Sequence, residues 1–123
     1  MAIAASVKIY FDGGCRPAPI GMETAVVAGG RVWLRHDLGP GAAMEAEWLA
    51  LIHAVRIARE LGVENPLFLG DALAVIEQAT GAVKCRAAFA RHLAALTDPA
   101  ALRIRHVKRT QNLAGIALAR LHR

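Results

Sequence analysis

The chain has 123 residues, 55% of them hydrophobic and 20% charged, with a formal net charge of +5 and a mean hydropathy of +0.35. This length suits a single domain over residues 1–123, because it leaves no room for a second core of normal size. No stretch is polar or repetitive enough to be disordered, and no apolar run suits a signal peptide or a membrane span. The two cysteines, Cys15 and Cys85, suit a reducing compartment better than a disulfide scaffold. We therefore expect a cytoplasmic protein that does not bind a membrane.

The charges are distributed unevenly along the chain. Residues 1–80 hold six Lys/Arg and nine Asp/Glu, a balance of −3, whereas residues 81–123 hold nine Lys/Arg and a single acid, Asp98, a balance of +8. A basic half beside an acidic half suggests a polyanionic partner combined with a carboxylate site. A solvated basic surface without a partner is the alternative that composition leaves open.

A strand pattern opens the chain at residues 7–12. Positions 7, 9 and 11 are apolar, which is the period-two pattern of a half-buried strand. Asp12 lies on the other face, where a carboxylate that loses its water needs a cation, a group of donors or an open cleft. Gly13 and Gly14 follow and allow another backbone or a ligand to approach closely. An ordinary Asp-Gly turn is the simpler explanation of these residues.

The next segments predict an antiparallel meander. A Pro/Gly-rich loop over residues 15–21 leads to a β-prone segment at Met22–Ala28, and Gly29-Gly30 is a hairpin signal. Residues 31–38 alternate again and form the third strand.

The strongest helix pattern covers residues 42–61. It is rich in Ala, Leu and Glu, contains no internal Gly or Pro, and ends before Gly62. Its apolar face consists of Ala50, Ala54, Ile57, Ala58 and Leu61. This face extends back to Glu47, which therefore points toward the sheet, while Glu45, about 200° away, points to solvent.

The second half of the chain alternates strands and helices. We expect a strand at 67–70 that ends at Asp71, helices at 72–80 and about 86–96, a strand with a basic face at 102–107, and a last helix through Arg123 that Asn112 caps. The order β-β-β-α-β-α-α-β-α predicts an α/β fold. Its five-stranded mixed sheet has three antiparallel meander strands followed by two parallel strands, flanked by helices.

Three carboxylates converge in this arrangement: Asp12 on the first strand, Asp71 at the carboxyl end of the fourth, and Glu47 on the crossover helix. Taken singly, they could be a turn residue, a helix N-cap and a helix-terminal charge. Close together, they repel unless cations lie between them or one keeps a proton. Hard oxygen ligands suit Mg²⁺ or Mn²⁺, and two such ions roughly 4 Å apart support phosphodiester hydrolysis. No His/Cys spacing indicates zinc, and no Walker or dinucleotide glycine loop is present.

Four blocks of the chain resemble ribonuclease H type 1, and most of all the compact bacterial and archaeal branch of that family without a basic protrusion. The blocks are Tyr10–Pro17, Glu45–Leu51, Leu69–Asp71 and Gln111-Asn112. They occur in the family's order and at its intervals over essentially the whole chain. The resemblance implies the ribonuclease-H-like fold and a hydrolase: a Mg²⁺-dependent endonuclease that cleaves the RNA strand of RNA–DNA hybrids.

The resemblance also implies roles for individual residues. Asp12, Glu47 and Asp71 would be the catalytic metal ligands, holding two Mg²⁺ (or Mn²⁺) ions when substrate is bound. The expected partner is an RNA–DNA hybrid, with no small-molecule cofactor, and we expect a monomer.

A second set of residues is predicted to contact nucleic acid. By resemblance Gly13, Gly14 and Cys15 would face the minor groove beside the RNA. Lys108 and Arg109, in a polar loop near the site, are candidate phosphate contacts, with solvated loop residues as the alternative. Arg16 and Asn112 complete the predicted nucleic-acid-binding set.

Three departures separate this chain from the family pattern. Ile116 stands where the family has a fourth Asp early in the last helix, and an isoleucine side chain cannot bind a metal ion. Residues 42–44, Ala-Ala-Met, replace the family's Thr-Asn-Asn before the Glu. The basic protrusion of longer members is absent, which leaves Lys84, Arg86 and Arg91 in that region.

These departures keep three interpretations open. The first is an active ribonuclease H with a three-carboxylate site, and the second is a ribonuclease-H-like module that binds nucleic acid with weak or lost catalysis. The third is an interaction protein that keeps only the fold. Metal-dependent cleavage separates the first two, and salt-dependent nucleic-acid affinity separates both from the third.

Overall fold

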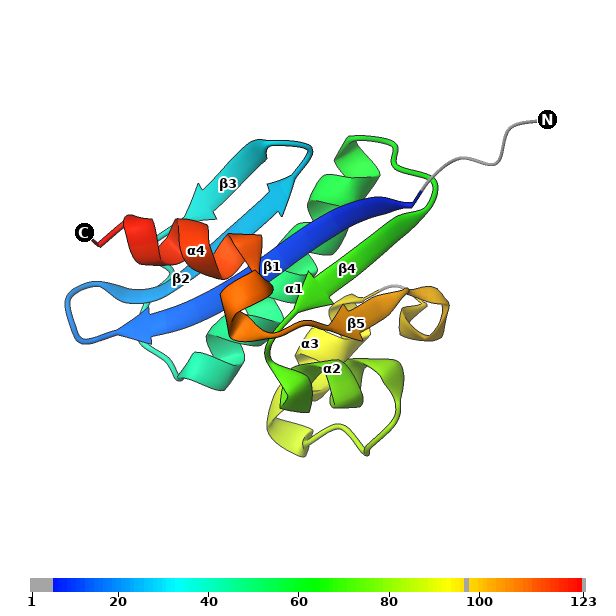
Figure 1. Ribbon diagram of the computed structural model, residues 1–123. Helices are drawn as coiled ribbons and strands as arrows, with labels where there is room; N and C mark the ends of the chain where they lie inside the picture. Colours follow the sequence, from blue (N-terminus) through cyan, green and yellow to red (C-terminus); the bar gives the residue numbers. More distant parts are fainter. Residues whose placement is uncertain (1–5, 97, 123) are drawn as a thin grey trace.

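The computed structural model describes residues 6–96 and 98–122, so that Arg123, the predicted end of the last helix, lies outside the described residues. The main elements are β1 (Val7–Arg16), β2 (Gly21–Ala28), β3 (Arg31–Arg35), α1 (Ala43–Glu60), β4 (Pro66–Gly70), α2 (Leu73–Thr80), α3 (Ala90–Ala95), β5 (Ile104–His106) and α4 (Leu113–Arg120) (Figure 1). Three short 3-10 helices, η1 (Ala87–Phe89), η2 (Pro99–Ala101) and η3 (Arg109–Gln111), complete the order. The predicted succession of strands and helices is confirmed. Within the described chain, no helix combines the length and apolar character needed to cross a membrane.

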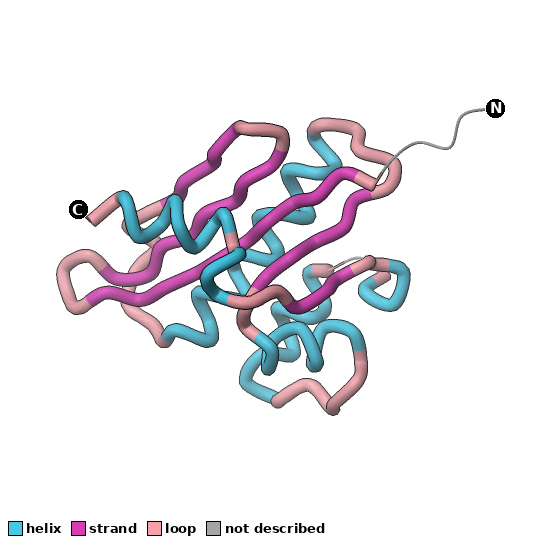
Figure 2. Tube along the Cα trace, in the orientation of Figure 1, coloured by secondary structure: helices cyan, strands magenta, loops and turns pink. Residues whose placement is uncertain are grey.

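The five strands form one mixed sheet in the order β3-β2-β1-β4-β5, with β1 at its centre. β1 is antiparallel to β2 and parallel to β4, and β5 is parallel to β4. Parallel pairing requires a long crossover, which α1 supplies between β3 and β4. Figure 2 shows this arrangement, with β1 flanked on both sides by strands and α1 passing behind the sheet. The predicted five-stranded mixed sheet is confirmed.

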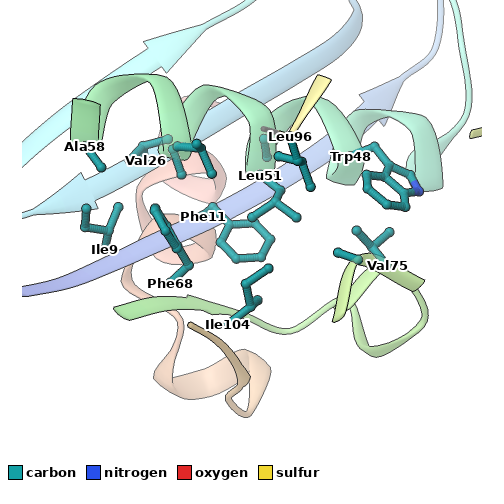
Figure 3. Packing of buried hydrophobic residues seen from close by; sticks show 14 of the residues in the cluster. Ile9, Phe11, Val26, Trp48, Leu51, Ala58, Phe68, Val75, Leu96 and Ile104 are labelled. Carbon is teal, nitrogen blue, oxygen red and sulfur yellow. The ribbon is translucent and has the colours of Figure 1, made fainter. Parts of the chain in front are cut away.

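Helices cover both faces of the sheet. α1 lies behind it and α4 crosses its front in the view of Figure 1. The larger hydrophobic cluster joins the sheet to α1 and α2, and Figure 3 shows its central members Ile9, Phe11, Trp48, Leu51, Phe68 and Val75. A smaller cluster under α4 contains Ala25, Val27, Ala114 and Leu118. The alternation in β1 thus places Ile9 and Phe11 in the core, although Val7 at the start of the strand is 39% exposed.

Several predicted boundaries were wrong. The third strand ends at Arg35 rather than at residue 38, because Asp37 has a positive φ of 57° that interrupts the extended backbone. The strand predicted at 102–107 is limited to Ile104–His106, because short β4 offers partners only from Phe68 to Gly70. The last helix ends at Arg120.

The helix predicted at about 86–96 is split into η1 and α3. Phe89 leaves helical geometry at the junction, with φ −111° and ψ 9°, and its ring stacks 6.2 Å from that of Trp48. Burial of this aromatic ring therefore accounts for the break in helical backbone geometry at Phe89. Leu61, predicted on the buried face of the long helix, is 46% exposed because α1 ends at Glu60 and Leu61 only caps it.

Candidate active site

β1 carries Asp12 to the place where the sheet, α1 and α4 meet. Its neighbours in sequence, Phe11 and Gly13, are buried, whereas Asp12 itself is half-buried. Asp12 turns toward α4, since a Cβ built on Gly115 of that helix would lie 3.4 Å from Asp12 Oδ2. The period-two pattern of β1 therefore delivers this carboxylate to an open part of the surface.

Gly13 allows α1 to approach β1 closely. A Cβ at this position would overlap the carbonyl oxygen of Ala46 and lie 2.7 Å from the backbone nitrogen of Glu47. Only a glycine tolerates this backbone contact. It holds the first turns of α1 against the strand and so brings Glu47 next to Asp12, which confirms the close backbone approach predicted at Gly13 and identifies α1 as the partner.

The three predicted carboxylates come together. One oxygen each from Asp12, Glu47 and Asp71 lies within 4.8 Å of the others, and among the described residues they form the one group of His, Cys, Asp and Glu that could hold a metal ion. Asp71 follows directly after β4, at the carboxyl end of the strand that runs parallel to β1. The convergence therefore results from parallel pairing of β1 with β4 and from the crossover by α1.

Repulsion and burial govern the protonation of this cluster. Burial, followed by the charges of Asp12 and Asp71, holds the pKa of Glu47 far above its ordinary range. Burial raises the pKa of Asp12 to about 6, against a hydrogen bond with Glu47 that lowers the pKa and together with the charge of Asp71, which raises it. Without a cation, the pair Asp12 and Glu47 therefore keeps a proton near neutral pH.

The cluster also contains a polar atom without a partner. Glu47 Oε2 is buried and forms no hydrogen bond with any described residue. A buried carboxylate oxygen without a donor is costly, and a divalent cation would satisfy it. All three ligands are hard oxygen atoms, as Mg²⁺ and Mn²⁺ prefer. The residues present therefore fit such a metal.

An open cleft of about 470 Å³ surrounds the carboxylates. Among the residues predicted to contact nucleic acid, those that line it are Gly13, Gly14, Cys15, Arg16 and Arg109. Arg109 contributes a positive charge near Asp12 that lowers the carboxyl pKa against the larger effect of burial. Lys108 is exposed and precedes η3 outside the lining residues. The cleft is thus lined both by carboxylates and by cationic side chains, a combination that suits a phosphate-bearing ligand held through metal ions.

Asn112 has a different place from the one expected of a nucleic-acid contact. Its side chain is 0% exposed. Nδ2 donates to the Phe11 carbonyl oxygen at 3.0 Å and lies 3.5 Å from Asp71 Oδ2, while Oδ1 accepts from Ala114 N at 3.1 Å. Asn112 therefore caps α4, as predicted, and positions Asp71. A buried side chain with these partners has no surface for a phosphate.

Two other predicted residues also have protein partners. Cys15 Sγ donates to the Gly41 carbonyl oxygen at 3.2 Å, and Arg16 Nε lies 3.8 Å from Glu23 Oε1. Ile116 is 37% exposed and lines the cleft, so its apolar side chain lies close to the acidic cluster.

Glu23 and His122 were missed by sequence reasoning. Glu23, on β2, is 2% exposed and lines the same cleft. Its two carboxylate oxygens lie 2.6 and 2.7 Å from His122 Nε2, at the end of α4. The signal for this pair was a lone charged residue within the mostly apolar segment Met22–Ala28, since a buried acid requires a partner. Its partner lies 99 residues away, beyond the reach of any local pattern.

Comparison with known proteins places this geometry in a family. Residues 28–122 match the family model described as reverse transcriptase-like. This match includes Glu47 and Asp71, while Asp12 lies before it. No curated protein sequence is significantly similar to the chain.

Solved structures show the same architecture over nearly the whole chain. RNase H1 from the halophilic archaeon Halobacterium salinarum is 26% identical, with a TM-score of 0.75 over 93% of this chain and 94% of that one. An RNase H1 isolated from compost by a metagenomic approach, solved in complex with an RNA/DNA hybrid, is 21% identical, with a TM-score of 0.77 over 92% and 93% of the two chains. The N-terminal RNase H domain of a Mycobacterium tuberculosis protein, solved as a fusion with maltose-binding protein, is 23% identical, with a TM-score of 0.73 over 93% and 95%.

The family match, the sheet order and the carboxylate cluster agree with the resemblance that the sequence motifs carry. The chain belongs to the reverse transcriptase-like family and has the architecture of the type 1 ribonucleases H.

Proposed function

We propose that the protein is a metal-dependent endoribonuclease that hydrolyses the RNA strand of RNA–DNA hybrids. The observation that carries this proposal is the carboxylate cluster: oxygens of Asp12, Glu47 and Asp71 lie within 4.8 Å of one another in an open cleft. Support comes from the likeness to the Halobacterium salinarum RNase H1, and from the compost enzyme with the same architecture that binds an RNA/DNA hybrid.

The three carboxylates would hold Mg²⁺ or Mn²⁺, and when bound such ions activate a water molecule and neutralise charge on the phosphate. The protein's own contribution is to position the ligands. Gly13 holds Glu47 beside Asp12, and the buried Asn112 amide restrains Asp71. Glu47 keeps its proton in the metal-free protein because its pKa is raised. Binding of a cation at this site therefore releases a proton, and metal affinity should rise with pH.

Arg109 and Arg16 lie at the border of the same cleft. Each can donate to a phosphate oxygen of the nucleic acid through a planar guanidinium group. The Arg16 side chain is exposed, and its Nε lies 3.8 Å from Oε1 of the buried Glu23. A phosphate oxygen would therefore share this guanidinium group with Glu23.

The test is cleavage of an end-labelled RNA–DNA hybrid by the purified protein in Mg²⁺ and in Mn²⁺, with duplex DNA and duplex RNA as control substrates. We expect hybrid-specific cutting that Asp71→Asn reduces by at least about 100-fold, because that change removes a metal ligand from the cluster. Glu45→Gln is the matched control, since Glu45 lies on the same helix as Glu47 but outside the cluster. Equal activity of Asp71→Asn and the unmutated protein would contradict the proposal.

The alternative of a binding module rests on one observation, the apolar Ile116 beside the carboxylates. Salt-sensitive binding of the hybrid with no cutting in either metal would favour this alternative over an enzyme.

A further inference from the structure

A second polar groove lies away from the carboxylates, between the edge strand β3 and α1. It encloses about 440 Å³, and its lining includes Trp33, Arg35, His53, Arg56 and Glu60. We call it the arginine groove. An inner hollow of about 100 Å³ adjoins it and shares Arg35, His53 and Arg56. The hollow is therefore large enough for a small oxyanion.

The charges that line the arginine groove are unbalanced. Arg35 and Arg56 are exposed, and neither side chain forms a hydrogen bond or ion pair with any residue that the structure describes. Glu60 is the acidic residue of the outer groove, and among the described residues the lining of the inner hollow contains no acid. Two guanidinium groups therefore border a small hollow without an anion to pair with.

His53 lines both the arginine groove and the hollow. Its side chain is 7% exposed, and Nδ1 lies 3.2 Å from Thr24 Oγ1. Burial, followed by the charges of Arg35 and Arg56, lowers the pKa of His53 to about 4. The ring is therefore neutral at physiological pH. When Nδ1 accepts from Thr24, Nε2 carries the proton and can donate to a ligand.

We propose that the arginine groove binds a phosphate group, held between the guanidinium groups of Arg35 and Arg56 with the His53 ring as a third donor. Arginine suits this ligand because its planar fork of N–H donors matches the geometry of phosphate oxygens. A phosphate bound in the arginine groove is negatively charged, so it also offsets the positive charges of Arg35 and Arg56 that disfavour protonation of the His53 ring.

The groove lies at the same end of the sheet as the carboxylate cluster. Arg35 pairs with Thr24, and Thr24 pairs with Gly13, the residue after Asp12. β3 is two strands from β1, which is roughly 10 Å at the usual spacing. The phosphate therefore belongs either to a nucleic acid that also reaches the carboxylates or to a small phosphorylated molecule. The first of these alternatives rests on the proposed function.

The test is an NMR titration of the histidine ring signals with inorganic phosphate at pH 6 and constant ionic strength, with His53 assigned from His53→Gln. We expect a saturable shift of the His53 signals, and a pH titration at saturating phosphate should show the pKa of His53 raised by about one unit or more. Arg35→Gln and Arg56→Gln should each abolish the saturable shift. Arg105→Gln is the matched control, because Arg105 is an exposed arginine on β5, at the opposite edge of the sheet.

No saturable shift, or an equal loss in Arg105→Gln, would overturn the proposal. A second experiment identifies the source of the phosphate from the salt dependence of RNA–DNA hybrid binding. If the slope of log affinity against log salt concentration is smaller by about one for Arg35→Gln than for the unmutated protein, the phosphate belongs to a nucleic acid. If the slope is unchanged while inorganic phosphate still shifts the His53 signals, the ligand is a small phosphorylated molecule. The titration needs no cleavage, so its result is independent of whether the carboxylate cluster is catalytic.

Discussion

Ile116 lies in the cleft that holds Asp12, Glu47 and Asp71. Its side chain is 37% exposed and offers no ligand to a cation. Asp12, Glu47 and Asp71 would therefore be the protein ligands available to a bound cation among the described residues, with water or phosphate oxygens supplying the rest.

We expect Ile116→Asp to strengthen metal binding, because a fourth carboxylate would face the same cleft. The Mg²⁺ concentration for half-maximal hybrid cleavage should fall about tenfold, equal to about 1.4 kcal/mol of binding free energy. In the metal-free protein the added charge should lower the melting temperature, since like charges repel.

The control for this substitution is Leu113→Asp, because Leu113 is an exposed residue of the same helix that does not line the cleft. It should leave the Mg²⁺ requirement unchanged. An equal effect of the two substitutions would show that a general change in surface charge is responsible, and the predicted role of position 116 would then be wrong.

At the scale of elements, the contact between β1 and α1 determines the shape of the site. Gly13→Ala should destabilise the protein by about 1–3 kcal/mol or more, because the new Cβ would overlap backbone atoms of Ala46 that cannot move independently of the helix. Gly14→Ala is the matched control, since its Cβ would lie 3.6 Å from Leu118 Cδ2, an ordinary contact. Urea unfolding of both variants measures the difference, and equal midpoints would contradict the steric explanation.

The end of α4 is fixed to β2 by the pair Glu23 and His122. Removing His122 takes away the closest hydrogen-bond partner of the buried Glu23 carboxyl group, and a hydrogen bond to a charged group contributes about 1.5–3 kcal/mol. His122→Ala should therefore destabilise the protein by about 2 kcal/mol, with Arg16 Nε, 3.8 Å away, as the remaining neighbouring donor. In the His122→Ala variant, backbone hydrogen exchange should be faster at the end of α4 than in α1.

A double-mutant cycle isolates this interaction. Glu23→Gln combined with His122→Ala should be less destabilised than the sum of the two single variants. Additive effects would show that the two side chains contribute separately, and that the short distances between them carry no coupling energy.

At the scale of the whole molecule, the acidic site makes stability depend on pH. The pKa of Asp12 rises from 3.8 to about 6 on folding, and that of Glu47 also rises. The folded protein then binds more protons than the unfolded chain, so these groups lower the free energy of unfolding as pH increases. His53 acts in the opposite direction, because its pKa falls from 6.5 to about 4 and its contribution is lost as pH falls through that window.

The contribution of His53 levels off above its unfolded pKa of 6.5, so the carboxylates dominate toward higher pH. In EDTA we expect the melting temperature to fall from pH 6.5 to pH 9, and Mg²⁺ or Mn²⁺ should largely remove this fall by neutralising the cluster. Glu47→Gln should reduce both the pH dependence and the stabilisation by metal. A melting temperature that is independent of pH in EDTA would contradict the raised pKa values of this cluster.

The sequence by itself determined the parts that depend on local periodicity. Alternation in β1 placed Ile9 and Phe11 in the core and Asp12 on the other face, and the apolar face of the long helix turned Glu47 toward the sheet. The order of strands and helices then predicted a mixed sheet with the three carboxylates at one end. These inferences succeeded because side-chain direction in a strand or helix follows from spacing alone.

Tertiary structure decided the features that depend on contacts between distant residues. The length of β5 depends on β4, and the break before α3 depends on the packing of Phe89 against Trp48. The partner of Glu23 and the burial of Asn112 likewise require α4 to lie across β1 and β2. No local pattern encodes these results, because a buried polar group is stabilised by whichever donor the completed fold brings within hydrogen-bond distance.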